Sequence, residues 1–215
     1  MQKRQLFMIA AVAAAAVAWS VGAQTARPDP KMSFFITGVG LGDGGNLGGL
    51  AGADKHCTAL AAKVGASKKA WRAYLSADPG TNARDRIGTG PWYNFKGELI
   101  ARNVTELHSD PSSPNKDVSL TETGLVVNGR GDMPNKHDML TGSDMDGSVA
   151  KGTTNLTCAN WTSNGAGSAQ VGHHDRRGTG PNTTSWNSAH ASRACSQADL
   201  VATGGSGLFY CFATD

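Results

Sequence analysis

The fold of this chain is decided by Cys158-Ala159-Asn160-Trp161, by Cys195 and by the closing run Gly207-Leu208-Phe209-Tyr210-Cys211-Phe212. The remaining cysteine is Cys57, and four cysteines allow three pairings, among which the sequence does not choose. We favour the nested pairing, Cys57 with Cys211 and Cys158 with Cys195, because it ties an early helix to the last strand around a smaller loop. By the chain-entropy relation the two closures would add about 5 and about 4 kcal/mol to the free energy of unfolding.

The N-terminus has the pattern of a secretory leader. Lys3 and Arg4 precede an apolar run from Leu6 to Val17, and Val21-Gly22-Ala23 offers small residues for cleavage after Ala23. The apolar run is shorter than the about 20 residues that a membrane helix needs. We therefore expect residues 1–23 to be a signal peptide.

Removal of 23 leader residues from the 215 leaves 192, which suits one domain. We expect residues 24–32 to be a mobile lead-in and residues 33–215 to form the domain. No later segment is long and apolar enough to cross a bilayer, so no membrane span is expected after the leader is removed. An even cysteine count fits an oxidising compartment, and we expect a secreted, periplasmic or cell-surface protein.

Charge and composition argue against a nucleic-acid-binding function and against helical or repeat architectures. The formal net charge of +3 falls to +1 when Lys3 and Arg4 leave with the leader, which is no basis for a nucleic-acid partner. With 28 glycines and 39% hydrophobic residues, the chain must place many turns and loops on a modest core. Long helices and repeat arrays are therefore excluded as the main architecture.

Short apolar patterns predict the first elements. Aromatic and β-branched runs predict strands at residues 33–37, 70–76 and 124–127, the last leading into the turn Asn128-Gly129. Residues 52–64 carry apolar or small side chains at spacings of three and four, which place one stripe on a helix. Cys57 belongs to that stripe and should face inward.

The chain resembles a known family. Gly52-Ala53-Asp54-x-x-Cys57 and Trp71-Arg72-Ala73-Tyr74-Leu75-Ser76 are similar to the opening of the endostatin domain of collagen. The resemblance continues in the same order, as islands over most of the chain after the leader, through Leu140-Thr141-Gly142-Ser143-Asp144 with Gly147, Cys158-x-x-Trp161, Cys195 and Phe209-Tyr210-Cys211. With its alanine-rich leader, the chain is more similar to bacterial secreted proteins loosely called lectins than to an animal matrix fragment.

Endostatin domains are similar in fold to C-type lectins. The resemblance therefore implies an α+β, C-type-lectin-like fold: a mixed, mostly antiparallel sheet with two helices, long Gly-rich loops and two nested disulfides. The resemblance does not imply that this chain binds the ligands of the family, because the residues that bind them are missing or are offset by opposite charges. The N-terminal histidines that bind zinc in endostatin are absent from residues 24–37. Acidic neighbours offset the clustered arginines, and Trp186-Asn187-Ser188 lacks the carboxylate that ends the calcium-lectin tripeptide.

Two stretches are candidates for cation binding. Asp144-Met145-Asp146-Gly147 can supply oxygen ligands to calcium, although the remaining positions of an EF-hand are missing and a polar turn is the alternative. His173-His174-Asp175 can contribute to a metal site, but adjacent histidines seldom point at one ion, and no second cluster is evident.

Three other features have two interpretations each. His190 and Asp199, near Cys195, can be catalytic in principle, but no nucleophile motif accompanies them and a structural role is favoured. Arg130-Gly131-Asp132 matches an integrin-binding tripeptide, and a solvated turn is favoured. Trp161 is expected in the core, whereas Trp186, in a polar loop, is expected at the surface as a platform for sugar rings.

These patterns favour a secreted binding module that recognises a carbohydrate, or a surface or matrix protein, through the loops between residues 124 and 186. The candidate ligand-binding residues are Asp144, Asp146, Trp186, Asn187 and His190, with calcium as the candidate cofactor. An enzyme on a lectin-like scaffold and a structural envelope or matrix protein are the alternatives, since fold does not determine function.

Overall fold

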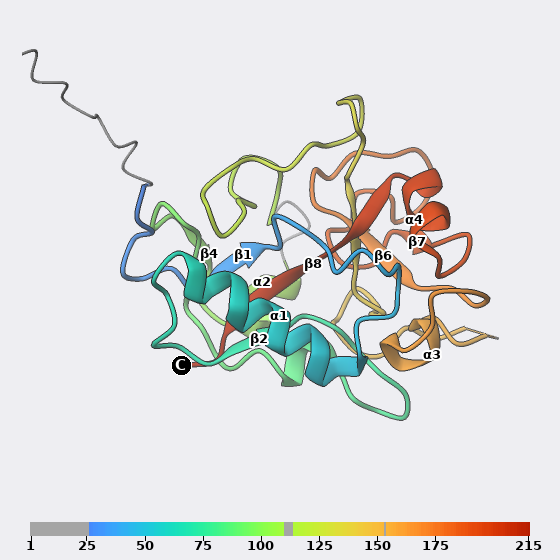
Figure 1. Ribbon diagram of the computed structural model, residues 1–215, viewed down its shortest axis with the longest axis horizontal. Helices are drawn as coiled ribbons and strands as arrows, with labels where there is room; N and C mark the ends of the chain where they lie inside the picture. Colours follow the sequence, from blue (N-terminus) through green and yellow to red (C-terminus); the bar gives the residue numbers. More distant parts are fainter. Residues whose placement is uncertain (1–25, 110–113, 153) are drawn as a thin grey trace, which may run out of the picture.

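The computed structural model describes residues 26–109, 114–152 and 154–215 (Figure 1). The expected signal peptide, residues 1–23, lies outside the described residues. Of the expected lead-in, Asp29 donates its backbone N–H to the carbonyl oxygen of Phe95 at 2.9 Å, and Met32 is buried.

The last strand, β8 (Gly205–Ala213), is the centre of the main sheet (Figure 1). β1 (Phe34–Ile36) and β2 (Trp71–Ala73) both pair antiparallel with the C-terminal part of β8. β5 (Asp138–Leu140) runs parallel to β8 from Gly205 to Phe209. β6 (Gln170–His173) and β7 (His190–Ala191) continue the sheet with antiparallel pairings. The expected mixed, mostly antiparallel sheet is thereby confirmed.

Four α-helices lie in the described residues, rather than the two that the resemblance implies. They are α1 (Gly49–Lys63), α2 (Val104–Ser109), α3 (Cys158–Trp161) and α4 (Gln197–Thr203). α2 and α3 are short turns in long loops, without a helical stripe that a sequence pattern could reveal. A 3-10 turn (Ala83–Asp85) and a separate hairpin of β3 (Trp92–Tyr93) and β4 (Leu99–Ala101) complete the elements.

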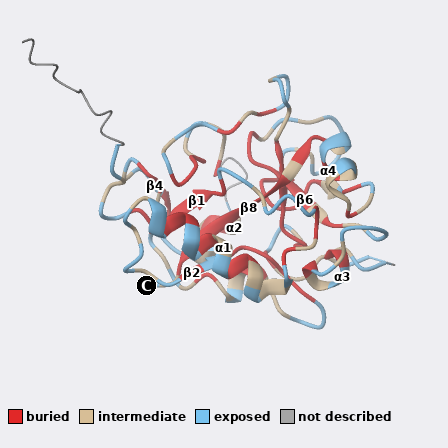
Figure 2. Ribbon diagram, in the orientation of Figure 1, coloured by how far each residue is buried: buried red, intermediate tan, exposed pale blue. Residues whose placement is uncertain are grey.

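Both faces of β8 are buried (Figure 2). α1 covers one face, where Phe209 and Cys211 join its buried side chains Ala53, Cys57 and Leu60 in one core cluster. The expected apolar stripe of the helix is thus confirmed. The opposite face carries a second cluster built mainly from aromatic side chains, among them Phe34, Tyr74, Trp92, Trp186, Tyr210 and Phe212.

The two disulfides are nested, as the sequence favours. Cys57 of α1 is bonded to Cys211 of β8, and Cys158 of α3 is bonded to Cys195. The sequence separations are 154 and 37 residues. The longer cross-link fastens the covering helix to the central strand, and the shorter one fastens the loops around β6 and β7.

α3 is a left-handed turn. Its four residues, Cys158 to Trp161, have φ angles of 47°, 53°, 57° and 66°, a conformation that costs about 1 to 2 kcal/mol per residue for side chains other than glycine. Several contacts hold it. Besides the disulfide of Cys158, the indole of Trp161 donates to the carbonyl oxygen of Ser76 at 2.8 Å, and the amide of Asn160 bonds both backbone groups of Asp78.

The strand expected at residues 124–127 is wrong. Val126 forms only an isolated bridge with Leu120, and within the described residues no strand pairs with residues 124–127. Leu125 and Val126 are accordingly 66% and 52% exposed. The apolar pattern of this segment reflects an exposed loop instead of a strand.

Removal of the longer cross-link should destabilise the fold more than removal of the shorter one. Because the stabilisation grows with loop length, the pair Cys57→Ala and Cys211→Ala should lower the free energy of unfolding by about 5 kcal/mol, against about 4 kcal/mol for Cys158→Ala with Cys195→Ala. Urea unfolding followed by circular dichroism measures both. A larger loss for the second pair would contradict this order.

Candidate metal centre

The edge of the sheet beyond β5 brings ionisable side chains together. Asp138 of β5 lies directly opposite His173 of β6 in the antiparallel register, so both side chains occupy one face. His190 of β7 pairs with Val171, two residues from His173, which makes His173 its diagonal neighbour on that face. His137 precedes β5 and completes the group.

Three imidazoles surround one carboxylate oxygen. Oδ1 of Asp138 lies 3.1 Å from Nε2 of His137, 3.2 Å from Nε2 of His173 and 3.6 Å from Nε2 of His190. His137, Asp138 and His173 are all buried, and one ligand atom of each lies within 4.8 Å of the others. In the described residues, these three are the one group of His, Cys, Asp and Glu side chains with metal-ligand spacing.

The outer ring nitrogens determine the orientation of each imidazole. Nδ1 of His173 lies 2.6 Å from the carbonyl oxygen of Thr183, and Nδ1 of His190 lies 3.1 Å from that of Ala191. Nδ1 of His137 faces a carboxylate oxygen of Asp175 at 3.4 Å. Since these oxygens only accept hydrogen bonds, each Nδ1 is placed to donate. In the corresponding neutral tautomer the Nε2 lone pair lies on the side of Asp138, although the rings of His137 and His173 stack with their planes 18° apart, so both would have to tilt to bind one ion.

The carboxylate of Asp138 is buried among imidazole rings. Asp138 is 3% exposed, and the nearest imidazole nitrogens, Nε2 of His137 and of His173, lie 3.1 and 3.2 Å from Oδ1 without the alignment of a regular hydrogen bond. Burial by itself raises the pKa of Asp138, but the neighbouring imidazoles outweigh burial and hold the pKa below its usual range. The carboxylate therefore remains charged. A buried charge is stable only beside an opposite charge, which here would be an imidazolium protonated at Nε2 or a metal ion.

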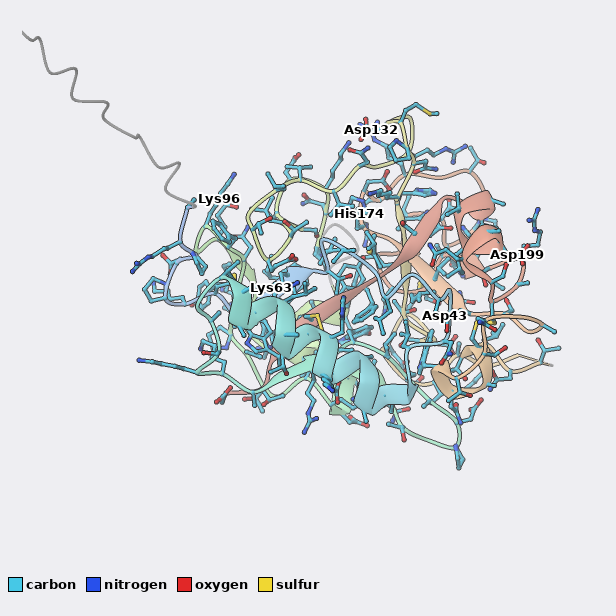
Figure 3. All side chains as sticks on the ribbon, viewed as in Figure 1. Asp43, Lys63, Lys96, Asp132, His174 and Asp199 are labelled. Atoms are coloured by element: carbon cyan, nitrogen blue, oxygen red, sulfur yellow. A yellow bond between two sulfur atoms is a disulfide. The ribbon has the colours of Figure 1, made fainter. Side chains whose placement is uncertain are left out.

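Asp175 anchors the site to a neighbouring turn. Its carboxylate faces His137 and accepts the backbone N–H groups of Arg130 and Arg177. Burial raises the pKa of Asp175, but these contacts outweigh burial and lower it. His174, labelled in Figure 3, points elsewhere: its Nε2 lies 3.1 Å from the carbonyl oxygen of Asn128. As expected of adjacent histidines, only His173 of the pair joins the group.

Of the five candidate ligand-binding residues, only His190 belongs to this group, and of the second cation candidate only His173 is one of its three buried members. Asn187 is buried, and its Nδ2 donates to the hydroxyl of Tyr74 and to the carbonyl oxygens of Asp144 and Met145. The carboxylate of Asp146 accepts from Arg84 and Ser148. Asn187 therefore contacts the Asp144 turn as an amide donor to backbone carbonyl oxygens, while the carboxylate of Asp146 bonds Arg84 and Ser148 instead.

Trp186 is buried rather than exposed. It is 3% exposed and packs against the rings of Tyr74, His108 and Tyr210, so the expected surface position is corrected. It still lines a cavity of about 350 Å³, together with Met145 and Asn182. Trp161, expected in the core, is fully buried there.

The remaining candidates have structural partners. Ser196 is the N-cap of α4: its hydroxyl accepts the backbone N–H of Asp199 and donates to the Asp199 carboxylate, which also pairs with Arg193. The aspartate of Arg130-Gly131-Asp132 accepts from Lys116 and from the backbone N–H of Gly129. These contacts occupy the two carboxylates within the fold.

No protein-family model matches the chain, and none of the curated proteins matches it. The likeness to endostatin domains and the C-type-lectin-like fold therefore remain predictions, whereas the α+β class, the mixed sheet and the two disulfides are observed. Within the described ranges, no helix has the length and apolar character to span a bilayer.

A partly buried histidine next to the aromatic cluster should make stability depend on pH. Nδ1 of His108 donates to the carbonyl oxygen of Val104 at 2.7 Å, and its Nε2 lies 2.7 Å from the hydroxyl of Tyr74. Burial lowers the pKa of His108, so the folded state disfavours the charged ring. The unfolded chain takes up the proton first, and stability is lost as pH falls below the ordinary histidine pKa of about 6.5.

The variant His108→Gln should weaken this dependence. The free energy of unfolding, measured in urea at pH 7.5 and at pH 5.5, should fall less in the variant than in the wild-type protein. Equal falls in both proteins would show that His108 does not contribute to the acid sensitivity.

Proposed function

We propose that the protein binds a transition-metal ion of the zinc class through His137, Asp138 and His173. The observation that carries the proposal is the position of the two imidazoles: their Nδ1 atoms face oxygen acceptors, and their Nε2 atoms lie beside the buried carboxylate of Asp138. Such outer partners fix the orientation and raise the basicity of metal-binding histidines.

The spacing of the ligand atoms fits this class of ion. Bonds of about 2.0 to 2.1 Å to a tetrahedral ion place the ligand atoms about 3.3 Å apart. Oδ1 of Asp138 lies 3.1 Å from Nε2 of His137 and 3.2 Å from Nε2 of His173. Imidazole nitrogen suits zinc, copper, nickel and iron, whereas calcium and magnesium prefer oxygen ligands alone.

We further propose that the metal centre serves an exported binding module on a lectin-like scaffold, which recognises a carbohydrate or a surface protein through the loops between residues 124 and 186. Two observations connect the metal centre with these loops. The loop that follows β6 begins directly after His173, and the carboxylate of Asp175 contacts both His137 and the backbone N–H of Arg130. Leu125 and Met133 flank that turn and are 66% and 90% exposed, which favours a protein partner.

Metal binding is tested by titration of the metal-free protein with zinc, followed by calorimetry. We expect one equivalent to bind and to raise the melting temperature, because a ligand that binds only the folded state stabilises it. His173→Gln or Asp138→Asn should weaken zinc binding at least tenfold. His56→Gln is the control, since His56 contacts Val39 and Phe209 on the side of α1. A folded wild-type protein that takes up no zinc would contradict the proposal.

Calcium binding by the turn at Asp144 and Asp146 is a separate proposal. Calcium should raise the melting temperature of the zinc-loaded protein, and Asp144→Asn should remove that increase, because the turn would lose a charged oxygen ligand. If neither calcium nor a calcium-selective chelator changes the melting temperature, the turn does not bind calcium and this proposal is wrong.

A further inference from the structure

We infer that His190 is the fourth ligand of the proposed metal ion and the ligand on its solvent side, through which the ion enters and leaves. The inference rests on the proposed function, because a fourth ligand exists only if His137, Asp138 and His173 hold a metal. It goes further by defining the coordination as three imidazoles and one carboxylate, and by assigning exchange to one residue.

The position of His190 completes the set of ligand atoms. Its Nε2 lies 2.9 Å from Nε2 of His173 and 3.6 Å from Oδ1 of Asp138, on either side of the about 3.3 Å expected between ligands of a tetrahedral ion. Its Nδ1 faces the carbonyl oxygen of Ala191, so the Nε2 lone pair is turned toward the group.

The contact between His173 and His190 needs a hydrogen or a metal ion between the two rings. Their Nε2 atoms lie 2.9 Å apart, and with the hydrogen of each ring on Nδ1, two lone pairs would face each other. Two lone pairs at this distance repel unless a proton or a metal ion lies between them. A single proton would join one pair of nitrogens, whereas one metal ion satisfies all three imidazoles and the carboxylate at once.

Exposure separates His190 from the other ligands. The side chain of His190 is 35% exposed, against 6% for His137, 3% for His173 and 2% for Asp138. β7 has only two residues and, among the described strands, pairs only with β6 at the end of the sheet. An edge strand of this length constrains its side chain less than β5 and β6 constrain theirs, so His190 is the ligand that can release the ion.

The inference is tested with cobalt(II) as the probe in the full chain. His190→Gly should still bind cobalt through the other three ligands, with at least tenfold weaker affinity. The strong visible absorption of four-coordinate cobalt should weaken, because water would fill the vacated position and raise the coordination number. Zinc should be removed by a chelator at least tenfold faster from this variant than from the wild-type protein. Millimolar imidazole should restore the absorption.

Ala191→Gly is the matched control, because it introduces glycine into the same strand and keeps the imidazole. It should retain the wild-type affinity, spectrum and zinc dissociation rate. If His190→Gly also retains all three, His190 is not a ligand and the inference is overturned, while the proposed function stands. Binding that is lost in His190→Gly and not restored by imidazole would overturn it as well. If the wild-type protein binds no cobalt, the proposed function itself fails.

Discussion

The structure depends on the burial of β8 on both faces and along both edges. β1 and β2 pair with its C-terminal part, α1 is cross-linked to it through Cys211, and an aromatic cluster covers its other face. β5 pairs in parallel with its N-terminal part, and the backbone N–H of Asp138 donates to the carbonyl oxygen of Gly204 at the end of α4. The most constrained strand thus determines where Asp138 lies.

At that position the sheet carries a buried charged group, the carboxylate of Asp138. A buried carboxylate without donors is costly, and cores normally pair such a group or bind a metal with it. Around Asp138 the surrounding rings direct their hydrogens outward, to Thr183, Ala191 and Asp175. The Nε2 atoms of the three rings lie 3.1 to 3.6 Å from one oxygen of that carboxylate, where protons on these nitrogens or a metal ion can balance its charge.

Local pattern sufficed for much of the fold. The strand at residues 33–37, the helix at 52–64 and the strand at 70–76 were predictable because their apolar periodicity is local. The nested disulfides were favoured because they join an early helix to the last strand, although the sequence left three pairings open. Trp186 was misplaced because its polar neighbours suggested an exposed loop, although Ser185 and Asn187 bond each other within the core. Residues 124–127 look like a strand, but among the described residues they form only the isolated bridge between Val126 and Leu120.

The candidate metal centre was only partly accessible to sequence reasoning. His173 and His190 attract notice as isolated residues, but His137 and Asp138 become significant only through the register of β5 with β6, which Gly-rich loops separate by about 30 residues. Adjacency in sequence therefore did not predict the members of the group. Strand pairing brings together residues at β5, β6 and β7, whereas His174, next to His173 in sequence, contacts Asn128 instead.

X-ray absorption at the zinc edge, on protein loaded with one equivalent of zinc, tests the central claim most directly. The account predicts four nitrogen or oxygen ligands at about 2.0 to 2.1 Å, with the outer-shell scattering of three imidazole rings and no sulfur. A spectrum of six oxygen ligands without imidazole scattering would contradict it, because the ion would then lie outside the group around Asp138.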